Sequence, residues 1–379
     1  MPASAERPAT QALYSSLDAL PTPCVLIDED RVTANLASFQ HCMDAAGVAL
    51  RPHAKTHKTL QLADRQLANG AAGLAVAKPS EARVFANHGV AQIDVAFPVV
   101  GASGAGLVAE LARATRIAVH TDSPTGVRAL SRAAVEADST IRVLLEVDGG
   151  LGRCGLAPDA VDAAAELCRL IERLPAVTFD GVATYVGMGT AEACREGPWA
   201  AGVREGKLIT AFARELRSRG FSVERVIAGS TATGPGAAST AGLTEVRAGA
   251  YAFMDGAQLT HGTASADAVA LTVLATVVSA SPSGRVTFDA GSKTLSAAGP
   301  AIGDAYAIAL GGNVRVTRLN EEHGIAELAP FAPPVPVGTR LRLIPSYASA
   351  VVGMADELVV VRGERVVDGW PVAARGCST

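Results

Sequence analysis

Five basic side chains (arginine, histidine or lysine) lie within eight consecutive residues, in the segment Arg51-Pro-His-Ala-Lys-Thr-His-Lys58. The chain has only 7 histidines and is 49% hydrophobic, so this segment is its densest cluster of such groups. Pro52 favours an extended conformation for Arg51, and a helical pattern begins near Thr59. We therefore expect a strand that runs through the segment and places Lys55 at its tip, where α/β folds usually carry their chemistry.

A lysine at a strand tip can form an imine with a carbonyl group, bind a phosphate, or be an ordinary solvated surface charge. Attack on a carbonyl needs the neutral amine, which burial and nearby positive charges both favour. We expect the apolar strand to bury Lys55, and four neighbours to supply positive charge: Arg51, His53, His57 and Lys58. Together with the barrel inferred below, this indicates a carbonyl cofactor held as an imine, of which pyridoxal phosphate is the commonest.

Two glycine-rich segments have the composition that such a cofactor requires. The loop Ala228–Gly236 follows the seventh expected strand and would offer backbone N–H groups to a phosphate; a plain flexible loop is the alternative. The turn Asp148–Gly155 follows the fifth strand and carries Arg153, which would reach a pyridine ring nitrogen. The alternative for Arg153 is a salt bridge with Asp148.

Composition excludes several classes of function. The net charge is −4 and 18% of residues are charged, with no long basic stripe, so nucleic acid is not expected as a partner. No secretory signal and no membrane-spanning run is recognisable. The six cysteines are scattered, without a C-x-x-C pair, which is typical of reduced thiols in a cytoplasmic protein.

Strand and helix patterns alternate over roughly 200 residues. The expected strands are 48–55, 73–76, 93–97, 116–120, 141–147, 177–185, 223–228 and 245–247. The expected helices between them are 60–67, 80–86 with Ser80 as cap, 106–113, 124–137, 158–173 with Pro158 in the first turn, and 202–219. Eight such units favour an α/β fold with a closed (β/α)8 TIM-type barrel, and a doubly wound open sheet is the competitor.

The pattern of expected secondary structure changes after Asp255. Short strands between glycine and proline turns are expected at 268–278, 285–289, 338–344, 357–362 and 365–367, with no helix longer than two turns. We therefore divide the chain into an N-terminal mobile arm (1–21), a cofactor-binding barrel (22–258) and a C-terminal mainly-β domain (259–379).

Six motifs resemble, in order, those of the D-threonine aldolase / D-serine dehydratase family. They are Thr22-Pro-x4-Asp28, Arg51–Lys58, Glu146-Val-Asp148 with Gly152-Arg-Cys-Gly155, Arg247–Asp255, Asp289-Ala-Gly-x-Lys293 and Glu321-Glu-His-Gly324. The resemblance covers nearly the whole chain. It implies an alanine-racemase-like barrel with a C-terminal β-domain, with the strand 22–28 joining that domain, and a homodimer with active sites near the subunit interface.

The resemblance also implies roles for individual residues. Lys55 would carry the pyridoxal phosphate, with His53 and His57 as tuning or positioning groups, and Arg153 would face the ring nitrogen. Tyr185 would lie beside the cofactor. The phosphate end would be held by the loop Gly229–Gly234, including Ser230, Thr231 and Gly234, with Tyr251 nearby.

The chain departs from the family pattern at two places. The family carries a histidine and a cysteine or acidic residue that bind a divalent metal, where this chain has Ile344-Pro-Ser-Tyr-Ala-Ser-Ala350. Tyr347 and Ser349 are poor metal ligands, so we expect no metal at this position; other ligands, such as His323 or Asp356, are left open. The family also carries histidines just after the tyrosine that follows the sixth barrel strand. In this chain the corresponding stretch, Tyr185–Thr190, contains no histidine.

Three functions remain after these departures. The first is a lyase that acts on a D-3-hydroxy amino acid by retro-aldol cleavage or elimination, without the family's metal. The second is a metal-independent amino-acid racemase or epimerase, which needs two bases at Cα, for example Lys55 and Tyr347. The third is a non-catalytic pyridoxal phosphate binder.

Overall fold

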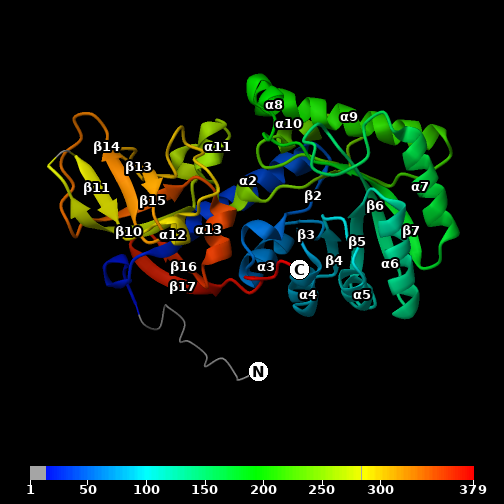
Figure 1. Cartoon of the computed structure of the whole chain (residues 1–379), viewed down its shortest axis with the longest axis horizontal. Coiled ribbons are helices and arrows are strands. Elements are labelled where there is room, and N and C mark those ends of the chain that lie inside the picture. Colours follow the sequence, from blue (N-terminus) through cyan, green and yellow to red (C-terminus); the bar gives the residue numbers. More distant parts are fainter. Residues whose placement is uncertain (1–13, 283) are drawn as a thin grey trace. The chain divides into compact units, whose positions relative to one another are not determined.

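The computed structural model describes residues 14–282 and 284–379, which divide into two compact units (Figure 1). The barrel unit comprises residues 37–249 and 376–379. The β-unit comprises the described residues up to Leu36 and residues 250–375. The sequence assigned residues 22–258 to the barrel, with the strand 22–28 expected to join the β-domain. In the structure the strand at 24–28 pairs with two strands of the β-unit, which also includes residues 29–36 and 250–258.

Eight parallel strands form the sheet of the barrel unit. They are β2 (Ala49–Leu50), β3 (Leu74–Val76), β4 (Gln92–Val95), β5 (Arg116–Thr121), β6 (Ile141–Val147), β7 (Val177–Thr184), β8 (Arg225–Ala228) and β9 (Glu245–Val246), hydrogen-bonded in the order β2-β9-β8-β7-β6-β5-β4-β3. The two end strands are themselves joined, since the backbone N–H groups of Ala72 and Ala75 donate to the carbonyl oxygens of Leu50 and Pro52 (2.8 Å each). This closure confirms the barrel and overturns the open-sheet alternative.

Helices connect successive strands of the barrel (Figure 1). They are α3 (Leu60–Ala68), α4 (Pro79–Asn87), α5 (Ala102–Leu111), α6 (Pro124–Glu136), α7 (Val161–Arg173), α8 (Ala191–Glu196), α9 (Pro198–Ser218) and α10 (Gly234–Ala238), while α2 (Glu29–Ala45) precedes the first barrel strand. The positions predicted for the first residues of two helices were wrong. Pro79 occupies the first turn of α4, so Lys78 and not Ser80 is the N-cap. Pro158 lies in a turn closed by Ala160 N–H and Ala157 O (2.9 Å), and α7 begins after it.

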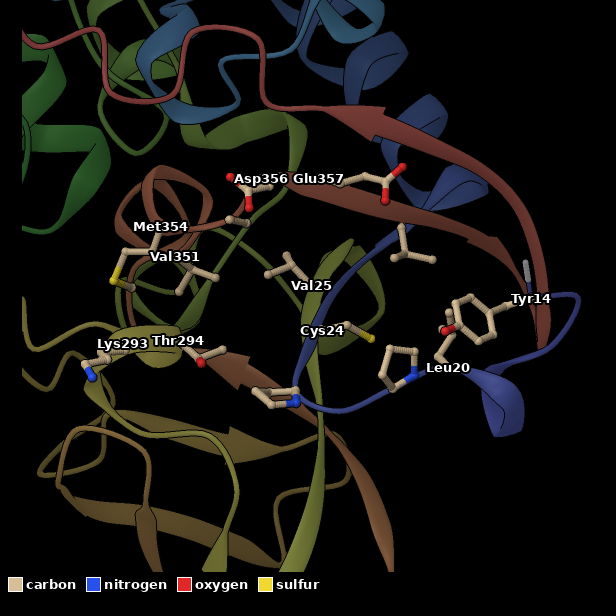
Figure 2. Close-up of a pocket in the computed structure, with 14 residues that line it drawn as sticks. Tyr14, Leu20, Cys24, Val25, Lys293, Thr294, Val351, Met354, Asp356 and Glu357 are labelled. Atoms are coloured by element: carbon tan, nitrogen blue, oxygen red, sulfur yellow. The ribbon is translucent and has the colours of Figure 1, made fainter. Parts of the chain in front are cut away.

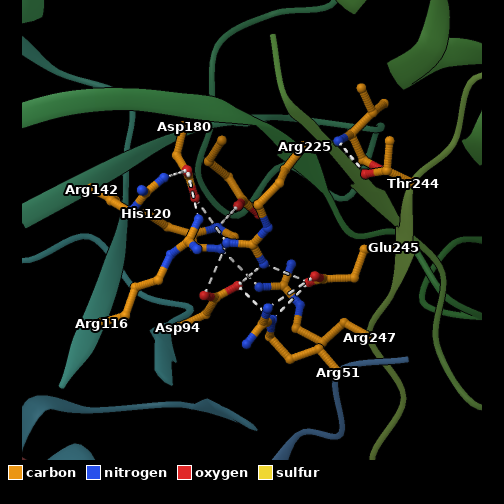
Figure 3. A network of polar contacts seen from close by, with 12 residues as sticks. Arg51, Asp94, Arg116, His120, Arg142, Asp180, Arg225, Thr244, Glu245 and Arg247 are labelled. Atoms are coloured by element: carbon orange, nitrogen blue, oxygen red, sulfur yellow. Dashed lines mark hydrogen bonds and ion pairs between the residues drawn. The ribbon is translucent and has the colours of Figure 1, made fainter. Parts of the chain in front are cut away.

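A buried ionic network crosses the interior of the barrel (Figure 3). Arg51 donates two hydrogen bonds to Glu245 (2.9 and 3.1 Å) and lies 3.3 Å from Asp94. Arg225 contacts Asp94 (2.5 Å), Glu245 (2.6 Å) and Asp180 (3.0 Å). The network thus ties together β4, β7, β8 and β9 and the residue that follows β2, and Arg225 and Glu245 are the first residues of their strands.

Lys55 does not lie at a strand tip as the sequence predicted. The strand β2 ends at Leu50, and residues Ala54–Thr56 form a 3-10 helix, η2, that carries Lys55. The side chain of His53 caps this helix by accepting a hydrogen bond from Lys55 N–H (3.4 Å). Gly249 passes close by: a Cβ at Gly249 would lie 2.5 Å from the Thr56 hydroxyl, so only glycine fits there.

The β-unit is built on one nine-stranded sheet. Its strands are β1 (Cys24–Asp28), β10 (Leu271–Ala280), β11 (Arg285–Phe288), β12 (Ala307–Ala309), β13 (Val314–Leu319), β14 (Gly324–Leu328), β15 (Arg340–Pro345), β16 (Glu357–Arg362) and β17 (Arg365–Pro371). The order is β11-β14-β13-β12-β15-β10-β1-β16-β17, and β10 also pairs with β11. Only β1 and β16 pair in parallel among these described strands.

Short helices complete the β-unit. They are α11 (Gly256–Thr260), α12 (Ser292–Leu295) and α13 (Ala348–Met354), with the 3-10 turns η1 (Leu17–Ala19), η3 (Ala250–Ala252) and η4 (Ala266–Ala268). The prediction of a mobile arm over residues 1–21 was wrong for its second part. Leu17 and Leu20 are buried there in an apolar cluster with Leu26 of β1. The first 13 residues of that arm lie outside the described residues. No helix among the described residues is long and apolar enough to cross a membrane.

The buried network predicts that Asp94 contributes strongly to stability. Burial alone would raise the pKa of Asp94, but the guanidiniums of Arg51 and Arg225 outweigh it and lower the pKa to about 2. An Asp94→Asn variant leaves these guanidiniums short of a counter-charge, so urea unfolding at pH 7 should show a loss of about 3–5 kcal/mol.

The matched control is Asp64→Asn, which removes an exposed contact with His88 (2.9 Å) and should cost less than about 1 kcal/mol. Because the pKa of Asp94 is depressed, its contribution is present above about pH 4 and is lost as pH falls toward 2. The difference between wild type and Asp94→Asn should therefore shrink over that range; an unchanged difference would contradict the assignment.

Candidate active site

Several of the residues expected to do chemistry lie at the carboxyl ends of the barrel strands. Lys55 lies in η2 after β2, and Tyr185 directly follows β7. The Lys55 Nζ atom lies 5.9 Å from the centre of the Tyr185 ring, and the Arg153 guanidinium lies 5.1 Å from the same centre. The structure therefore brings together Lys55, Tyr185 and Arg153, which come from three different strand-to-helix segments.

The pKa of Lys55 is lowered from 10.5 to about 8. Burial is the largest cause, followed by the positive charges of Arg153 and Arg247, while Glu81 acts in the opposite direction. A shift of this size disfavours the ammonium form by about 3 kcal/mol. A lysine in this setting supplies far more neutral amine at neutral pH than an ordinary surface lysine, which favours attack on a carbonyl.

The expected source of positive charge was wrong in its details. Arg51 points into the ionic network, and the Lys58 ammonium pairs with Glu81 at 2.9 Å. Burial lowers the pKa of His57 to about 4, so its imidazole is neutral. The cations that act on Lys55 come instead from segments about 100 and 190 residues further along the chain.

A chain of buried polar groups lies behind Lys55 and His53. Arg247 is 6% exposed, and its Nη1 atom lies 2.9 Å from Nε2 of His120, whose Nδ1 contacts Glu146. Burial and then Arg247 lower the pKa of His120. With a neutral ring, Nε2 accepts from Arg247 and Nδ1–H donates to Glu146. Burial, followed by Lys55 and Arg247, holds the pKa of His53 well below its usual value.

Arg153 is exposed and lies in a turn organised by Asp148. The Asp148 carboxylate accepts backbone hydrogen bonds from Gly150 (2.9 Å) and Gly152 (3.0 and 3.1 Å). The salt bridge considered between Arg153 and Asp148 is not among the ion pairs of the described residues. The Arg153 guanidinium instead contacts the face of the Tyr185 ring.

The loop 229–234 follows β8 and leads into α10. Gly229 has a φ of +86°, a left-handed conformation that favours glycine. Thr233 N–H donates to the Ser230 hydroxyl (3.2 Å), and Gly234 N–H donates to the Ser230 carbonyl (2.8 Å). The Thr231 hydroxyl is buried and has no hydrogen-bond partner in the described structure. A buried hydroxyl without a partner is costly unless a ligand satisfies it.

Tyr251 and Tyr347 belong to the β-unit. Tyr251 is buried in η3, whereas Tyr347 is 41% exposed and is the N-cap of α13. Asp255 fixes this turn, because its carboxylate accepts from Ala348 N–H (3.0 Å) and Gln258 N–H (3.1 Å). Burial raises the pKa of Asp255 to about 6. Ser346 adds two further contacts, to Ala301 N–H (3.0 Å) and the Ala305 carbonyl (2.8 Å).

Residues 14–282 and 284–379 contain no group of three or more His, Cys, Asp or Glu side chains arranged to hold a metal ion. Among these residues, neither His323 nor Asp356, the alternative ligands that the sequence left open, belongs to such a group. Asp356 pairs with Arg375.

A cavity of about 260 Å³ lies in the β-unit (Figure 2). It is lined by Cys24 and Val25 of β1 and by Val351 and Met354 of α13, among others, and none of the expected site residues borders it. Burial raises the pKa of Cys24 to about 12, so its thiol stays protonated near neutral pH. The cavity therefore offers no activated nucleophile at this position.

Two buried residues near the site were not predicted. Arg247 appeared in a motif without a role, yet it is a main influence on Lys55. Glu205 of α9 was not noticed, although it is 1% exposed and accepts hydrogen bonds beside Tyr185 and in the loop 229–234. A glutamate within an apolar helix face, flanked by Gly202 and Gly206, is the signal that would have drawn attention to it.

Comparisons with known proteins agree with this geometry. The model of the alanine racemase N-terminal domain matches residues 27–256, and that of a putative serine dehydratase domain matches residues 270–361. A D-threonine aldolase of Arthrobacter sp. is 37% identical over 94% of this chain and 93% of its own length. A D-threo-3-hydroxyaspartate dehydratase of Delftia sp. (strain HT23) is 31% identical over 94% of this chain and 98% of its own.

Among solved structures, the D-threonine aldolase from Filomicrobium marinum superposes with a TM-score of 0.87 at 30% identity, covering 96% of this chain and 98% of that one. The match is spread over both units, so it accounts for the barrel and for the β-unit alike. The chain therefore belongs to the alanine racemase N-terminal domain family, and a match to a putative serine dehydratase domain follows at residues 270–361.

Proposed function

We propose that the chain is a pyridoxal phosphate-dependent lyase that acts on a D-3-hydroxy amino acid, by retro-aldol cleavage or by elimination. The observation that carries the proposal is the state of Lys55, whose pKa is lowered to about 8 by burial and by two guanidiniums. The aldolase and dehydratase relatives supply the substrate class. The six cysteines are free, which supports the cytoplasmic location expected from the sequence; the family resemblance supports a homodimer.

The residues present fit pyridoxal phosphate. The partnerless Thr231 hydroxyl offers a donor for a phosphate oxygen, in a loop that starts with Gly229 and ends at the first residue of α10. Lys55 would attach the aldehyde, and Ser230, Thr231 and Gly234, with Tyr251, would hold the phosphate end. When bound, the cofactor supplies an electron sink for the bonds at the substrate's Cα.

Two arginines compete for the ring nitrogen. The sequence assigned this position to Arg153, which is exposed and lies over the face of the Tyr185 ring. Arg247 is buried and is held by His120, so its guanidinium is better organised in advance. Arg153 is the candidate that the sequence indicates, and Arg247 is the alternative that the buried contacts favour. Either arginine would leave a pyridine nitrogen unprotonated and moderate the electron sink.

Lyase chemistry also needs a proton to move at the substrate's 3-hydroxyl oxygen. The segment that carries the metal ligands in the family has Tyr347 and Ser349 here, and no histidine follows Tyr185 before Thr190. We propose that a tyrosine hydroxyl, of Tyr347 or Tyr185, moves this proton. The same substitution favours a second candidate, a metal-independent racemase, in which Lys55 Nζ and the Tyr347 hydroxyl would exchange the proton at Cα.

Attachment through Lys55 predicts a visible absorbance band. Wild-type protein incubated with pyridoxal phosphate should keep the band after dialysis, because the cofactor is bound covalently. Lys55→Ala should lose it, whereas Lys293→Ala, which removes a surface lysine paired with Glu321 and Glu322, should not. A Lys55→Ala protein that keeps the band would contradict the assignment.

The charge of Arg153 predicts a pH effect. The rate at which apo-protein captures pyridoxal phosphate should rise with pH through about 8, as the Lys55 ammonium loses its proton. Arg153→Gln removes a neighbouring positive charge, so the midpoint of this rise should move toward 10.5. The control is Arg169→Gln, an arginine that lies over the Phe221 ring (5.8 Å) and should leave the midpoint unchanged. Equal midpoints in all three proteins would refute the role of Arg153.

The two candidate reactions give different products from D-threonine. A retro-aldol lyase should release glycine and acetaldehyde, assayed with Mn²⁺ and with a chelator to test the need for metal. Tyr347→Phe should lower the rate about 100-fold or more if its hydroxyl moves a proton, while Tyr306→Phe, in the same unit, should have little effect. Exchange of the Cα proton in deuterated water without cleavage would instead favour the racemase.

A further inference from the structure

A single buried carboxylate joins the two loops that flank the proposed cofactor position. Oε1 of Glu205 accepts hydrogen bonds from the backbone N–H of Val186 (3.1 Å) and of Gly229 (3.2 Å). Oε2 accepts from the Thr233 hydroxyl (3.0 Å). Val186 directly follows Tyr185, and Gly229 and Thr233 bracket Ser230 and Thr231. The ring-side loop and the phosphate-side loop are therefore fixed to the same two oxygen atoms.

The helix that carries Glu205 lies unusually close to these loops. A Cβ at Gly202 would lie 2.1 Å from the Thr233 carbonyl oxygen, and a Cβ at Gly206 would lie 2.5 Å from the Thr240 hydroxyl. The contact is equally close from α10, where a Cβ at Gly236 would lie 2.2 Å from the carbonyl oxygen of Trp199 in α9. Glycines on both helices thus permit an approach of the backbones that brings the short Glu205 side chain within reach of the loops.

The placement of Glu205 is not explained by charge attraction to the proposed ligand. A carboxylate behind a phosphate-binding loop would repel the phosphate, so its presence needs another reason. Its oxygens satisfy donors in two segments that are rich in glycine and would otherwise lose much conformational entropy on ligand binding. Burial raises the pKa of Glu205, and the N–H and hydroxyl donors oppose that shift. The geometry therefore points to alignment of the loops as its role.

We propose that Glu205 is a positioning residue that sets the placement of the phosphate-binding loop 229–234 relative to Tyr185, and thereby gives the protein its affinity for the phosphorylated cofactor. This inference rests on the proposed function, because it presumes that pyridoxal phosphate is the ligand. It differs from a general stabilising role, since a residue that only stabilises the barrel would not change the preference for pyridoxal phosphate over pyridoxal.

The test compares binding of pyridoxal phosphate with binding of pyridoxal, which lacks the phosphate, by absorbance titration of apo-protein. Glu205→Ala removes the acceptor for the donors of both loops, so we expect a loss of about tenfold or more in affinity for pyridoxal phosphate. Affinity for pyridoxal should fall much less. Glu205→Gln keeps one oxygen as an acceptor and offers an amide N–H to Thr233, so it should restore most of the preference.

The matched control is Asp180→Asn, a buried acid on β7 that binds Arg142 and Arg225 in the ionic network and contacts neither loop. It should lower the free energy of unfolding in urea without changing the ratio of the two affinities. If Glu205→Ala does not fold, Thr233→Val removes one of the contacts to Glu205 and should lower the same ratio by a smaller factor.

The outcomes separate the two proposals. If the wild-type protein binds neither compound, the proposed function fails. If wild type prefers pyridoxal phosphate and Glu205→Ala, or Thr233→Val in its place, keeps the wild-type ratio of affinities, the role of Glu205 fails while the proposed function stands. A ratio that falls to the same extent in Asp180→Asn would also overturn the inference, because the effect would then be one of general stability.

Discussion

The double ion pair between Arg51 and Glu245 is the contact on which the rest of the barrel depends. The strands β2 and β9 are only two residues long each, so backbone hydrogen bonds alone join them weakly. Arg51 binds both oxygens of Glu245 across this pair, and the same carboxylate also binds Arg225. A planar guanidinium suits such a two-point contact, which a lysine would not reproduce. Gly73 leaves room for it, since a Cβ there would lie 2.2 Å from Arg51 Nη1.

This contact also explains why one short segment carries both the anchor and the proposed nucleophile. Arg51 is held inside the barrel, and only three residues separate it from Lys55 in η2. The position of Lys55 is thus set by a buried network that involves four strands. Removing two guanidiniums and three carboxylates from water is costly, and such networks often cost more than they contribute to stability. Here the network also determines how the barrel closes, and closure places η2 beside the segments that bear Arg153, Tyr185 and Arg247.

The sequence predicted the parts of the structure that local patterns determine. Buried strands such as β6 (Ile141–Val147) and amphipathic helices such as α6 have periodicities that need no distant partner, and they were located within a few residues. The strand at Arg51 was wrong because η2 is shaped by the His53 cap and by the approach of Gly249 from far along the chain. The charges on Lys55 were misassigned for the same reason: its neighbours in sequence, Arg51 and Lys58, pair with Glu245 and Glu81, and the cations that act on Lys55 come from distant segments. Glu205 was missed because its partners lie in two loops that only the fold brings together.

Most of the residues proposed to hold the cofactor and the main departure from the family pattern lie in different units. The barrel unit contains most of the residues proposed to hold the carbonyl cofactor and act at Cα: Lys55, His53, Arg153, Tyr185 and the loop 229–234. The departures from the family lie partly in the β-unit, where Asp255 and Ser346 fix the turn that bears Tyr347. A turn held by buried groups tolerates a changed side chain at its exposed position, because the backbone is positioned by neighbours that do not change. The β-unit can therefore change the side chain at position 347 while its turn, and the residues of the barrel unit proposed to hold the cofactor, stay as they are.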